Sequence, residues 1–232
     1  MNPLRRLLRY FTRGELLLLG SSVLLISLAF FAFNGWSQLT LVASLIGATA
    51  LILCAKGNPA GQALIVVFSL LYGVISYGFA YYGEMITYLG MTAPMAMLAL
   101  VSWLRNPYQG RRSEVRVNRI TGRETAFMLL LSAVVTGVFY LILRAFGTAN
   151  LLPSTLSVTT SFLAVYLTFR RSPYYALAYA ANDLVLIVLW VLASMTSTSY
   201  LSVAVCFVMF FVNDLYGLAS WLRMERRQRE DG

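Results

Sequence analysis

The sequence contains no histidine. This absence excludes histidine-based acid–base catalysis, histidine-ligated metal sites and histidine-ligated haem. Cysteine is nearly as scarce, and its two occurrences, Cys54 and Cys206, both lie inside apolar runs. Cysteines in such positions are typical of small packing residues and not of a disulfide framework. We therefore expect neither a metal nor a cofactor.

Charged residues are scarce as well. Charged residues make up 12% of the 232 positions, whereas hydrophobic residues make up 59%. A soluble domain has about a quarter of its residues charged, so most of the surface of this chain must face lipid. The mean hydropathy of +0.72 agrees with this interpretation. The sequence also lacks a phosphate-binding glycine loop of the Walker type, so we expect no ATP-driven step.

Eight apolar runs account for most of the chain, and each is long enough to cross a membrane as a helix of about 20 residues. The runs are 15–33, 39–55, 61–82, 85–104, 125–146, 153–169, 174–195 and 200–222. Two breaks end in Pro59 and Pro173, which fit the first turn of the next helix because no backbone hydrogen bond is lost there. The chain is therefore expected to be an all-α membrane protein with eight transmembrane helices.

Basic residues predict the orientation, because short loops rich in lysine and arginine stay on the cytoplasmic side. With the N-terminus inside, seventeen of the eighteen basic residues fall in cytoplasmic segments, and only Arg144 lies near the outer face. We expect a multi-pass protein of a bacterial inner membrane with cytoplasmic N- and C-termini. The net charge of +9 comes from these loops, so nucleic acid is not an expected partner.

Landmarks in the runs recur. The motif Ser-Trp-Leu-Arg closes the fourth run at 102–105 and the eighth at 220–223, and a proline precedes both the third and the seventh run. Chance similarity among apolar helices is the alternative. The repeat predicts two parallel three-helix bundles with a small-molecule site between them. The expected division is an N-terminal segment and extra helix (1–34), a first bundle (35–105), a cytoplasmic loop and linker helix (106–150), a second bundle (151–223) and a cytoplasmic tail (224–232).

Only two acidic residues lie deep in the apolar runs, Asp183 and Asp214, and each follows an asparagine. Ionisable groups in the hydrocarbon are costly and are therefore candidates for function. Helical spacing adds aromatic neighbours on the same or an adjacent face. The residues predicted to bind a small molecule from these two runs are Tyr179, Asn182, Asp183, Trp190, Asn213, Asp214 and Tyr216.

A carboxylate beside carboxamides and aromatic rings suits a ligand with an aromatic base and a hydroxylated sugar. The alternative is that the Asn-Asp pairs bridge helices, where such contacts contribute about 1 kcal/mol each. The asparagines favour the binding role, whereas the aspartates fit either role.

The third run adds Gln62, Ser69 and Tyr72, which either line a pathway or let helices approach closely. Trp103 and Trp221 have the positions of an aromatic belt at the membrane interface. Pro94 is expected to kink the fourth run. Near the outer face, Glu84 and Arg144 are expected to be solvated.

These residues resemble the PnuC family of vitamin transporters. The stretch 174–190, with Asn182-Asp183 and Trp190, is similar to the family's penultimate helix, and 212–217 through Trp221 is similar to its final helix. The likeness extends loosely over 39–229, including the Lys-Gly-Asn turn at 56–58. It implies the full-length SWEET-like arrangement, with two three-helix bundles joined by a linker helix, and some members carry an additional N-terminal helix.

The resemblance further implies facilitated diffusion of unphosphorylated nicotinamide riboside, which a cytoplasmic riboside kinase traps by phosphorylation. Relatives are thought to carry thiamine, riboflavin or deoxynucleosides. We favour nicotinamide riboside because the asparagines and Trp190 suit a ribosyl pyridinium, and an acid is available for its positive charge.

Two rival classes remain: a membrane-embedded enzyme and a scaffold without transport activity. An enzyme would need clustered acids or histidines at the interface, and the sequence has none. We therefore expect a transporter and not an enzyme. Its expected partners are a small-molecule vitamin, the lipid bilayer and, functionally, the kinase; whether copies of the chain form a homo-oligomer is left open by the sequence.

Overall fold

The computed structural model describes residues 10–34, 38–78, 82–148 and 150–231. Eight helices among these residues are long and apolar enough to cross a membrane, as expected from the sequence. Arginines 5, 6 and 9, which contributed to the expected orientation, lie outside the described residues. The first residues of the expected first bundle, 35–37, lie outside them as well.

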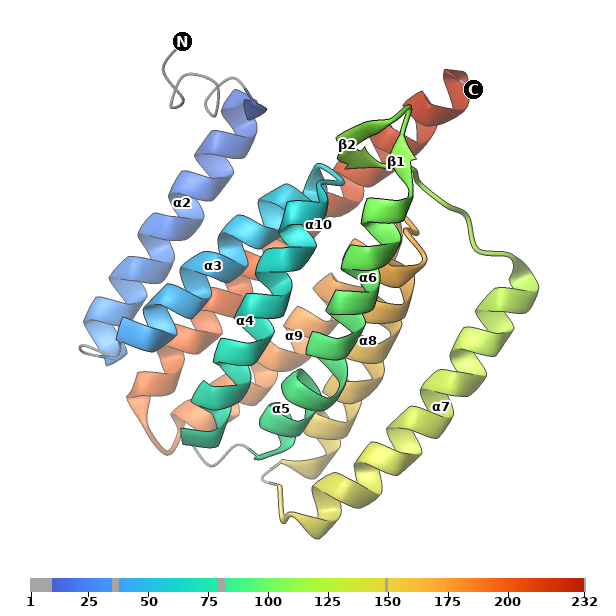
Figure 1. Ribbon diagram of the computed structural model, residues 1–232. Helices are drawn as coiled ribbons and strands as arrows, with labels where there is room; N and C mark the ends of the chain where they lie inside the picture. Colours follow the sequence, from blue (N-terminus) through green and yellow to red (C-terminus); the bar gives the residue numbers. More distant parts are fainter. Residues whose placement is uncertain (1–9, 35–37, 79–81, 149, 232) are drawn as a thin grey trace.

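The elements follow one another as helices joined by short turns (Figure 1). They are α2 (Arg13–Ala29) with the π-helical turn η1 (Phe30–Asn34), α3 (Gln38–Ala55), α4 (Pro59–Gly78), α5 (Tyr82–Thr87), η2 (Tyr88–Thr92), α6 (Ala93–Arg105), β1 (Pro107–Tyr108), β2 (Arg111–Val115), α7 (Gly122–Ala145), α8 (Leu151–Phe169), α9 (Tyr175–Ser194), η3 (Thr198–Tyr200) and α10 (Leu201–Glu230).

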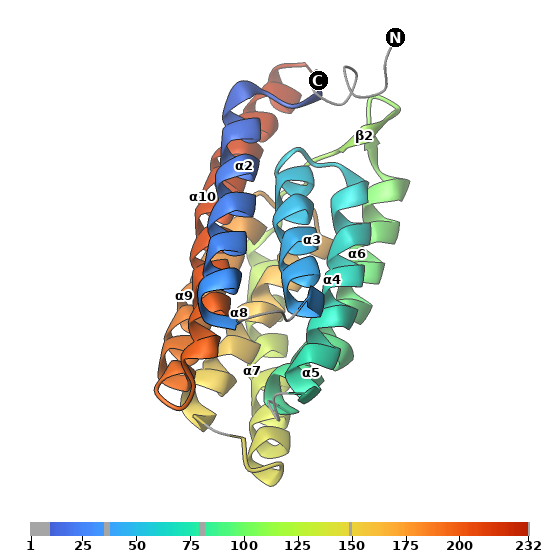
Figure 2. The ribbon, with the colours of Figure 1, turned by 90° about the vertical axis from the view of Figure 1, so that its left-hand side faces the viewer.

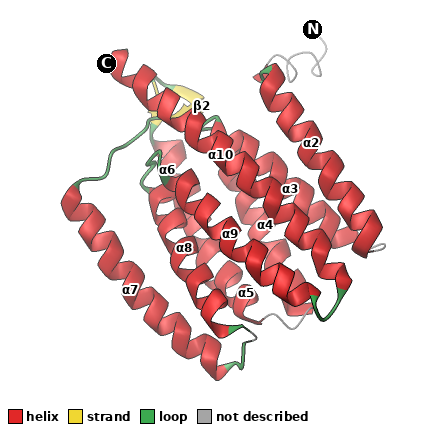
Figure 3. Ribbon diagram, turned by 180° about the vertical axis from the view of Figure 1, so that it is seen from behind, coloured by secondary structure: helices red, strands yellow, loops and turns green. Residues whose placement is uncertain are grey.

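The helices form the predicted pair of three-helix bundles. In the first, α4 packs against α3 and α6; in the second, α9 packs against α8 and α10. The bundles meet along two seams, α3 with α10 and α6 with α8. The linker helix α7 lies at one side, against α8 (Figures 1 and 3). The extra helix α2 covers the seam between α3 and α10 (Figure 2).

The turns that end α3 and α8 share one backbone hydrogen-bond pattern, which supports the internal repeat. Gly57 N donates to Cys54 O at 2.8 Å, and Arg171 N donates to Thr168 O at 3.0 Å. Both turns contain a residue with positive φ, +67° at Gly57 and +57° at Arg171. Such a residue commonly ends a helix by satisfying its last carbonyls. The two chain segments therefore fold alike although little of their sequence is shared.

The fourth span begins at Tyr82, slightly earlier than predicted, and is divided into α5, η2 and α6. Pro94 sits in the first turn of α6 directly after the π-helical turn. Proline and π-helical turns are recognised causes of helix bending. The expected kink at Pro94 stays a prediction, and the structure adds that the π-helical turn η2 directly precedes this proline.

Two buried tryptophans join the bundles at the end of the molecule where α2 begins and α10 ends. Trp103 Nε1 donates to Thr168 O at 2.9 Å, and Trp221 Nε1 donates to Cys54 O at 2.8 Å. The indole rings also pack on each other, with 5.3 Å between centroids. Each bond runs from the third helix of one bundle to the first helix of the other, so both seams are closed symmetrically.

The prediction that Trp103 and Trp221 form an interfacial belt was wrong, because both side chains are fully buried. Their end of the bundle is covered by the hairpin of β1 and β2, whose Val115 N donates to Gly57 O at 2.9 Å. The last turns of α10 also extend beyond the expected span end, to Glu230. Helical position alone indicates depth in the membrane but does not reveal this cover.

The close approach of α3 and α4 yields a stability prediction. A Cβ atom on Gly61 would lie 2.6 Å from Cys54 N and 2.9 Å from Ala50 O. Gly61→Ala must therefore push the helices apart, and overpacking of this kind costs about 1–3 kcal/mol. We expect a clearly lower thermal midpoint for the purified variant in detergent.

Gly20, in the middle of α2, is the matched control because a Cβ there would meet no atom within 4 Å. Gly20→Ala should leave the midpoint unchanged or raise it, since alanine favours a helix over glycine by about 1 kcal/mol. Equal midpoints for the two variants would contradict the close packing of α3 on α4.

Candidate binding site

A small buried pocket lies between the two bundles, near the middle of the helices. It is lined by α3, α4 and η2 from one side and by α8, α9 and α10 from the other. Besides two tyrosines, its polar lining consists of Ser69, Thr92, Ser161, Asn182, Asp183 and Asp214. Its volume is about 50 Å³, enough for on the order of one to a few water molecules.

The two deep aspartates meet in this pocket. Asp183 comes from α9 and Asp214 from α10, and their carboxyl groups are within hydrogen-bonding reach of each other. Each residue is only 4% exposed. None of the four ion pairs among the described residues includes either of them. The pocket therefore contains two adjacent carboxyl groups without a cationic side chain to balance them.

Asn182 is held in one orientation by α8. Its Oδ1 accepts hydrogen bonds from Thr160 Oγ1 at 2.8 Å and from Ser161 Oγ at 3.0 Å. Both lone-pair positions of the amide oxygen are thus used. The NH2 group remains as the end of the amide that can donate to a ligand.

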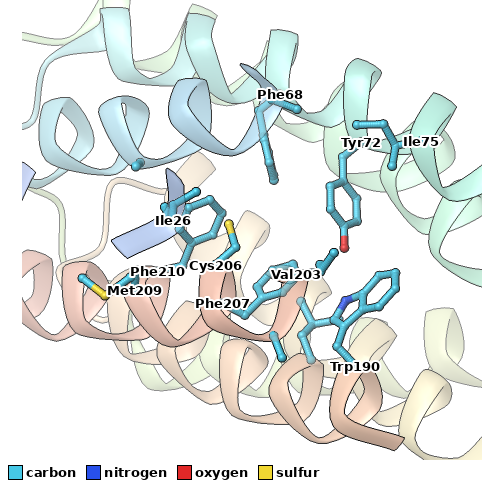
Figure 4. Packing of buried hydrophobic residues seen from close by; sticks show 14 of the residues in the cluster. Ile26, Phe68, Tyr72, Ile75, Trp190, Val203, Cys206, Phe207, Met209 and Phe210 are labelled. Atoms are coloured by element: carbon cyan, nitrogen blue, oxygen red, sulfur yellow. The ribbon is translucent and has the colours of Figure 1, made fainter. Parts of the chain in front are cut away.

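Aromatic rings close the pocket on the side away from the termini. Tyr72 lies 4.6 Å from Tyr88, 5.9 Å from Phe207 and 6.3 Å from Trp190, measured between ring centroids. Figure 4 shows the Tyr72 hydroxyl pointing toward the indole nitrogen of Trp190. We refer to Tyr72, Tyr88, Trp190 and Phe207 as the aromatic layer. The same figure shows Phe68 and Phe210 beside this layer, and their rings pack edge to face with 5.6 Å between centroids and 67° between planes.

A second aromatic group closes the opposite side. Tyr179 lines the pocket and packs on Tyr175 at 6.1 Å, and Tyr175 packs on Trp221 at 4.9 Å. Trp221 in turn belongs to the tryptophan pair that joins the bundles. The pocket is therefore closed toward both ends of the molecule.

The structure brings seven of the ten predicted site residues together. Ser69, Tyr179, Asn182, Asp183 and Asp214 line the pocket, while Tyr72 and Trp190 belong to the aromatic layer. Gln62 is buried nearer the termini, where its Nε2 lies 3.2 Å from Cys54 Sγ.

The other two predicted residues face the extra helix α2. Asn213 Nδ2 donates to Ser22 Oγ at 2.9 Å and to Met209 O at 2.7 Å. Tyr216 OH donates to Glu15 Oε1 at 3.1 Å. Neighbouring residues on a helix point in directions about 100° apart, so Asn213 and Asp214 meet different partners. Asn213 and Tyr216 are placed to attach α2 to the second bundle.

Several pocket residues were missed by the sequence reasoning. Ser161 and Thr92 bring hydroxyl groups into the pocket, and Phe207 brings a ring from α10. The density of serine and threonine in 153–169 was a usable signal, because so many hydroxyl groups are unusual in a lipid-facing helix. Tyr88 of η2 also lines the pocket and was not among the predicted residues.

Glu84 corrects another expectation, because it is 3% exposed and not solvated. Its Oε2 has no hydrogen-bond partner among the described residues. The neighbouring Gly83 explains the burial: a Cβ there would lie 2.9 Å from Leu143 and 3.0 Å from Thr148, so the end of α7 packs closely over α5. Arg144, by contrast, is exposed as predicted.

Comparison with known proteins agrees with the resemblance seen in the sequence. The family model described as nicotinamide mononucleotide transporter matches residues 37–223. A protein of Neisseria mucosa named nicotinamide riboside transporter PnuC is 27% identical over 202 residues, which cover 85% of this chain and 76% of that protein.

A solved structure reported as the vitamin B3 transporter PnuC has the same fold. It superposes with a TM-score of 0.82 at 24% identity and covers 94% of each chain. Since the family model spans most of the chain and the arrangement of helices agrees, this protein belongs to the PnuC family of membrane transporters.

Proposed function

We propose that this protein carries unphosphorylated nicotinamide riboside across the cytoplasmic membrane by facilitated diffusion, and that the substrate binds in the pocket between the bundles. The observation that carries the proposal is the composition of this pocket. It combines two carboxyl groups, an oriented carboxamide and aromatic rings at mid-depth of a membrane protein.

Charge favours the riboside over the mononucleotide named in the family description. The ring of the riboside is a pyridinium with a fixed positive charge, which a carboxylate and the faces of aromatic rings both attract. None of the described residues that line the pocket is basic. A phosphate group would therefore meet Asp183 and Asp214 without a cation to receive it, and like charges in a buried site repel strongly.

The remaining polar groups fit the amide and the sugar. The NH2 group of Asn182 can donate to a carbonyl or hydroxyl oxygen, and the Ser69 hydroxyl is fully buried without a partner among the described residues. Buried polar groups without partners are costly. A ligand that supplies hydroxyl groups relieves this cost at Ser69.

The pocket is closed in this structure. Ligand sites usually have roughly 300 Å³ or more, whereas this cavity has about 50 Å³. Binding therefore requires the rings around the cavity to separate. The aromatic layer on one side and the tryptophan pair on the other are the two barriers that would open alternately, as the bundles move against each other.

We also propose the direction of net transport, from the outside of the cell to the cytoplasm. The start of α2 and the end of α10 lie at the same end of the molecule (Figure 1), and the basic loops belong to that end. The positive-inside rule places it in the cytoplasm. Phosphorylation of the riboside by a cytoplasmic kinase would then trap the product and draw further substrate inward.

The first test of the function uses liposomes containing the purified protein, with equal pH and salt on both sides. With a riboside kinase and ATP enclosed, labelled nicotinamide riboside should accumulate well above its external concentration. Without the kinase the label should only equilibrate, because a facilitator performs no work. Liposomes with kinase but without the protein are the control.

Accumulation without the kinase under these conditions would contradict facilitated diffusion.

A competition experiment in the same liposomes tests the substrate. Thiamine, riboflavin, a deoxynucleoside and nicotinamide mononucleotide are each added together with the labelled riboside. We expect the mononucleotide to compete weakly. Strong competition by another vitamin and none by the riboside would assign a different substrate to the same pocket.

The two asparagines provide a second test. Asn182→Ala removes an amide that lines the pocket, and loss of one buried hydrogen bond to a ligand costs about 1–3 kcal/mol, so we expect Kd to rise by a factor between about 5 and 150. Asn213→Ala removes contacts to α2 instead. We expect it to lower the thermal midpoint while leaving Kd for the riboside nearly unchanged.

Isothermal titration and thermal unfolding of both variants separate these effects. An unchanged Kd for Asn182→Ala, measured on folded protein, would show that the substrate does not bind in this pocket. A scaffold without transport activity would show no vitamin binding in any variant.

A further inference from the structure

Glu84 is a buried acid that the proposed pathway through the pocket does not use. It lies in α5, is 3% exposed and belongs to none of the four ion pairs among the described residues. Its Oε2 atom also has no hydrogen-bond partner among these residues. A buried carboxyl group in a membrane span is costly unless something compensates it, and it is therefore a candidate for function.

Glu84 lies one helical turn beyond the aromatic layer, toward the end of the molecule away from the termini. Tyr88 follows it by four residues in the same span, so the two side chains lie on one face of the helix. The span starts with α5, at the end opposite the chain termini (Figure 1). Glu84 therefore precedes Tyr88 on the way in from that end. Its electrostatic interactions with Tyr72 and Tyr88 agree with this position.

Ser76 has the matching position on α4. It follows Tyr72 by four residues, again on one helical face, and α4 runs toward the same end of the molecule (Figure 1). Ser76 is fully buried, and its Oγ has no hydrogen-bond partner among the described residues. The rings of Tyr72 and Tyr88 lie 4.6 Å apart, and α4 packs on α5. Ser76 and Glu84 thus both lie on the side of this ring contact that faces away from the pocket.

No basic side chain forms an ion pair with Glu84 among the described residues. Arg144, at the end of α7, is exposed and belongs to none of their ion pairs either. A carboxylate beside tyrosine rings attracts a cation through its own charge and through the faces of the rings. The hydroxyl group of Ser76 adds a hydrogen-bonding group. These groups repeat the chemistry of the pocket on a smaller scale and suit the same pyridinium ring.

We propose that Glu84 and Ser76, beside the aromatic layer, form an outer binding site, which receives the cationic ring of the substrate before that layer opens. The inference rests on the proposed function and adds an entry step to it. The outer site is covered in this structure because the end of α7 packs over α5, where a Cβ atom on Gly83 would lie 2.9 Å from Leu143. Movement of this cover exposes the site to the outside.

The consequence is a path with two steps. Once water reaches Glu84, its carboxyl group ionises at neutral pH, and the cation meets this acid before it meets the aspartates of the pocket. The ring then moves on between Tyr72 and Tyr88 when the aromatic layer opens. Charge at an entrance raises the rate at which an oppositely charged ligand associates. The outer site therefore acts on entry at low substrate concentration.

Glu84→Gln tests the outer site because it removes the charge and keeps the size of the side chain. Initial uptake of labelled nicotinamide riboside is measured in intact cells of a bacterial host that lacks its own riboside transporter and supplies the kinase, so that every copy has the same orientation. We expect KM to rise on the order of tenfold with a nearly unchanged maximal rate. Glu84→Asp keeps the charge and should retain a KM close to that of the unaltered protein.

Glu230→Gln is the matched control, since this exposed acid lies at the end of α10, far from the outer site, and should leave KM unchanged. Isothermal titration of purified Glu84→Gln should give a Kd for the riboside close to that of the unaltered protein, because the pocket is intact. Ser76→Ala should raise KM about two- to tenfold through loss of one hydrogen bond. It becomes the deciding variant if thermal unfolding shows that Glu84→Gln is not folded.

An unchanged KM in Glu84→Gln, or in Ser76→Ala as the deciding variant, would overturn the outer site and leave the proposed function intact. No uptake and no binding by the unaltered protein would remove both. An equal rise of KM in Glu84→Gln and Glu84→Asp would show that the shape of the side chain matters and not its charge, and would overturn the proposal. A lower maximal rate with the same KM would assign Glu84 to the movement of the helices and would overturn it too.

Discussion

Two indole hydrogen bonds hold the bundles together at the end of the molecule that carries the termini, and the closed pocket depends on them. Each connects the third helix of one bundle with the end of the first helix of the other, and the two rings touch. In lipid, the hydrophobic effect does not draw apolar helices together, so close packing and polar contacts must hold them. The seams are therefore held at a few defined points, where small movements separate or join the bundles. Farther from this end, aromatic rings border the pocket on both sides, and packed rings can rearrange more easily than a hydrogen-bonded network.

The interior of the protein has an unusual balance of charge. Among the described residues, three buried acids in the spans have no salt-bridge partner, Glu84, Asp183 and Asp214, while the basic residues collect in the turns, the helix ends and the terminal segments. The same asymmetry, on which the expected orientation rests, thus leaves the pocket without basic side chains. The proposal of a cationic ring as substrate, in place of a phosphate ester, rests on this set of carboxyl groups without a basic side chain. The family description names a mononucleotide and the Neisseria relative a riboside, and it is this charge that leads us to propose the riboside.

Much of the fold could be predicted from the sequence, because hydropathy and loop charge are properties of each segment by itself. Such properties predicted the eight spans, the repeat and the position of Asp183 and Asp214 deep in their helices. The predictions that failed or were incomplete concern which helix faces which. Helical spacing places Asn213 beside Asp214, but only the position of α2 shows that one faces a neighbouring helix and the other the pocket. Glu84 and Trp221 were misjudged for the same reason, since packing from other segments buries them.

The extra helix α2 links both bundles, which makes it more than a peripheral addition. Glu15, almost fully buried, accepts hydrogen bonds from Lys56 in the first bundle at 2.9 Å and from Tyr216 in the second at 3.1 Å. Asn213 adds a second link to α10 through Ser22. Because α2 covers the seam between α3 and α10, any movement that widens this seam must lengthen or break the contacts on one side of Glu15. Removing one partner of a buried ion pair is costly, so the contacts of Glu15 resist opening of this seam. The other seam, between α6 and α8, is held differently: Ser102 Oγ donates to Phe169 O at 2.9 Å, beside the bond from Trp103 to Thr168 O. One seam is thus held by a covering helix and the other by direct hydrogen bonds between its own two helices.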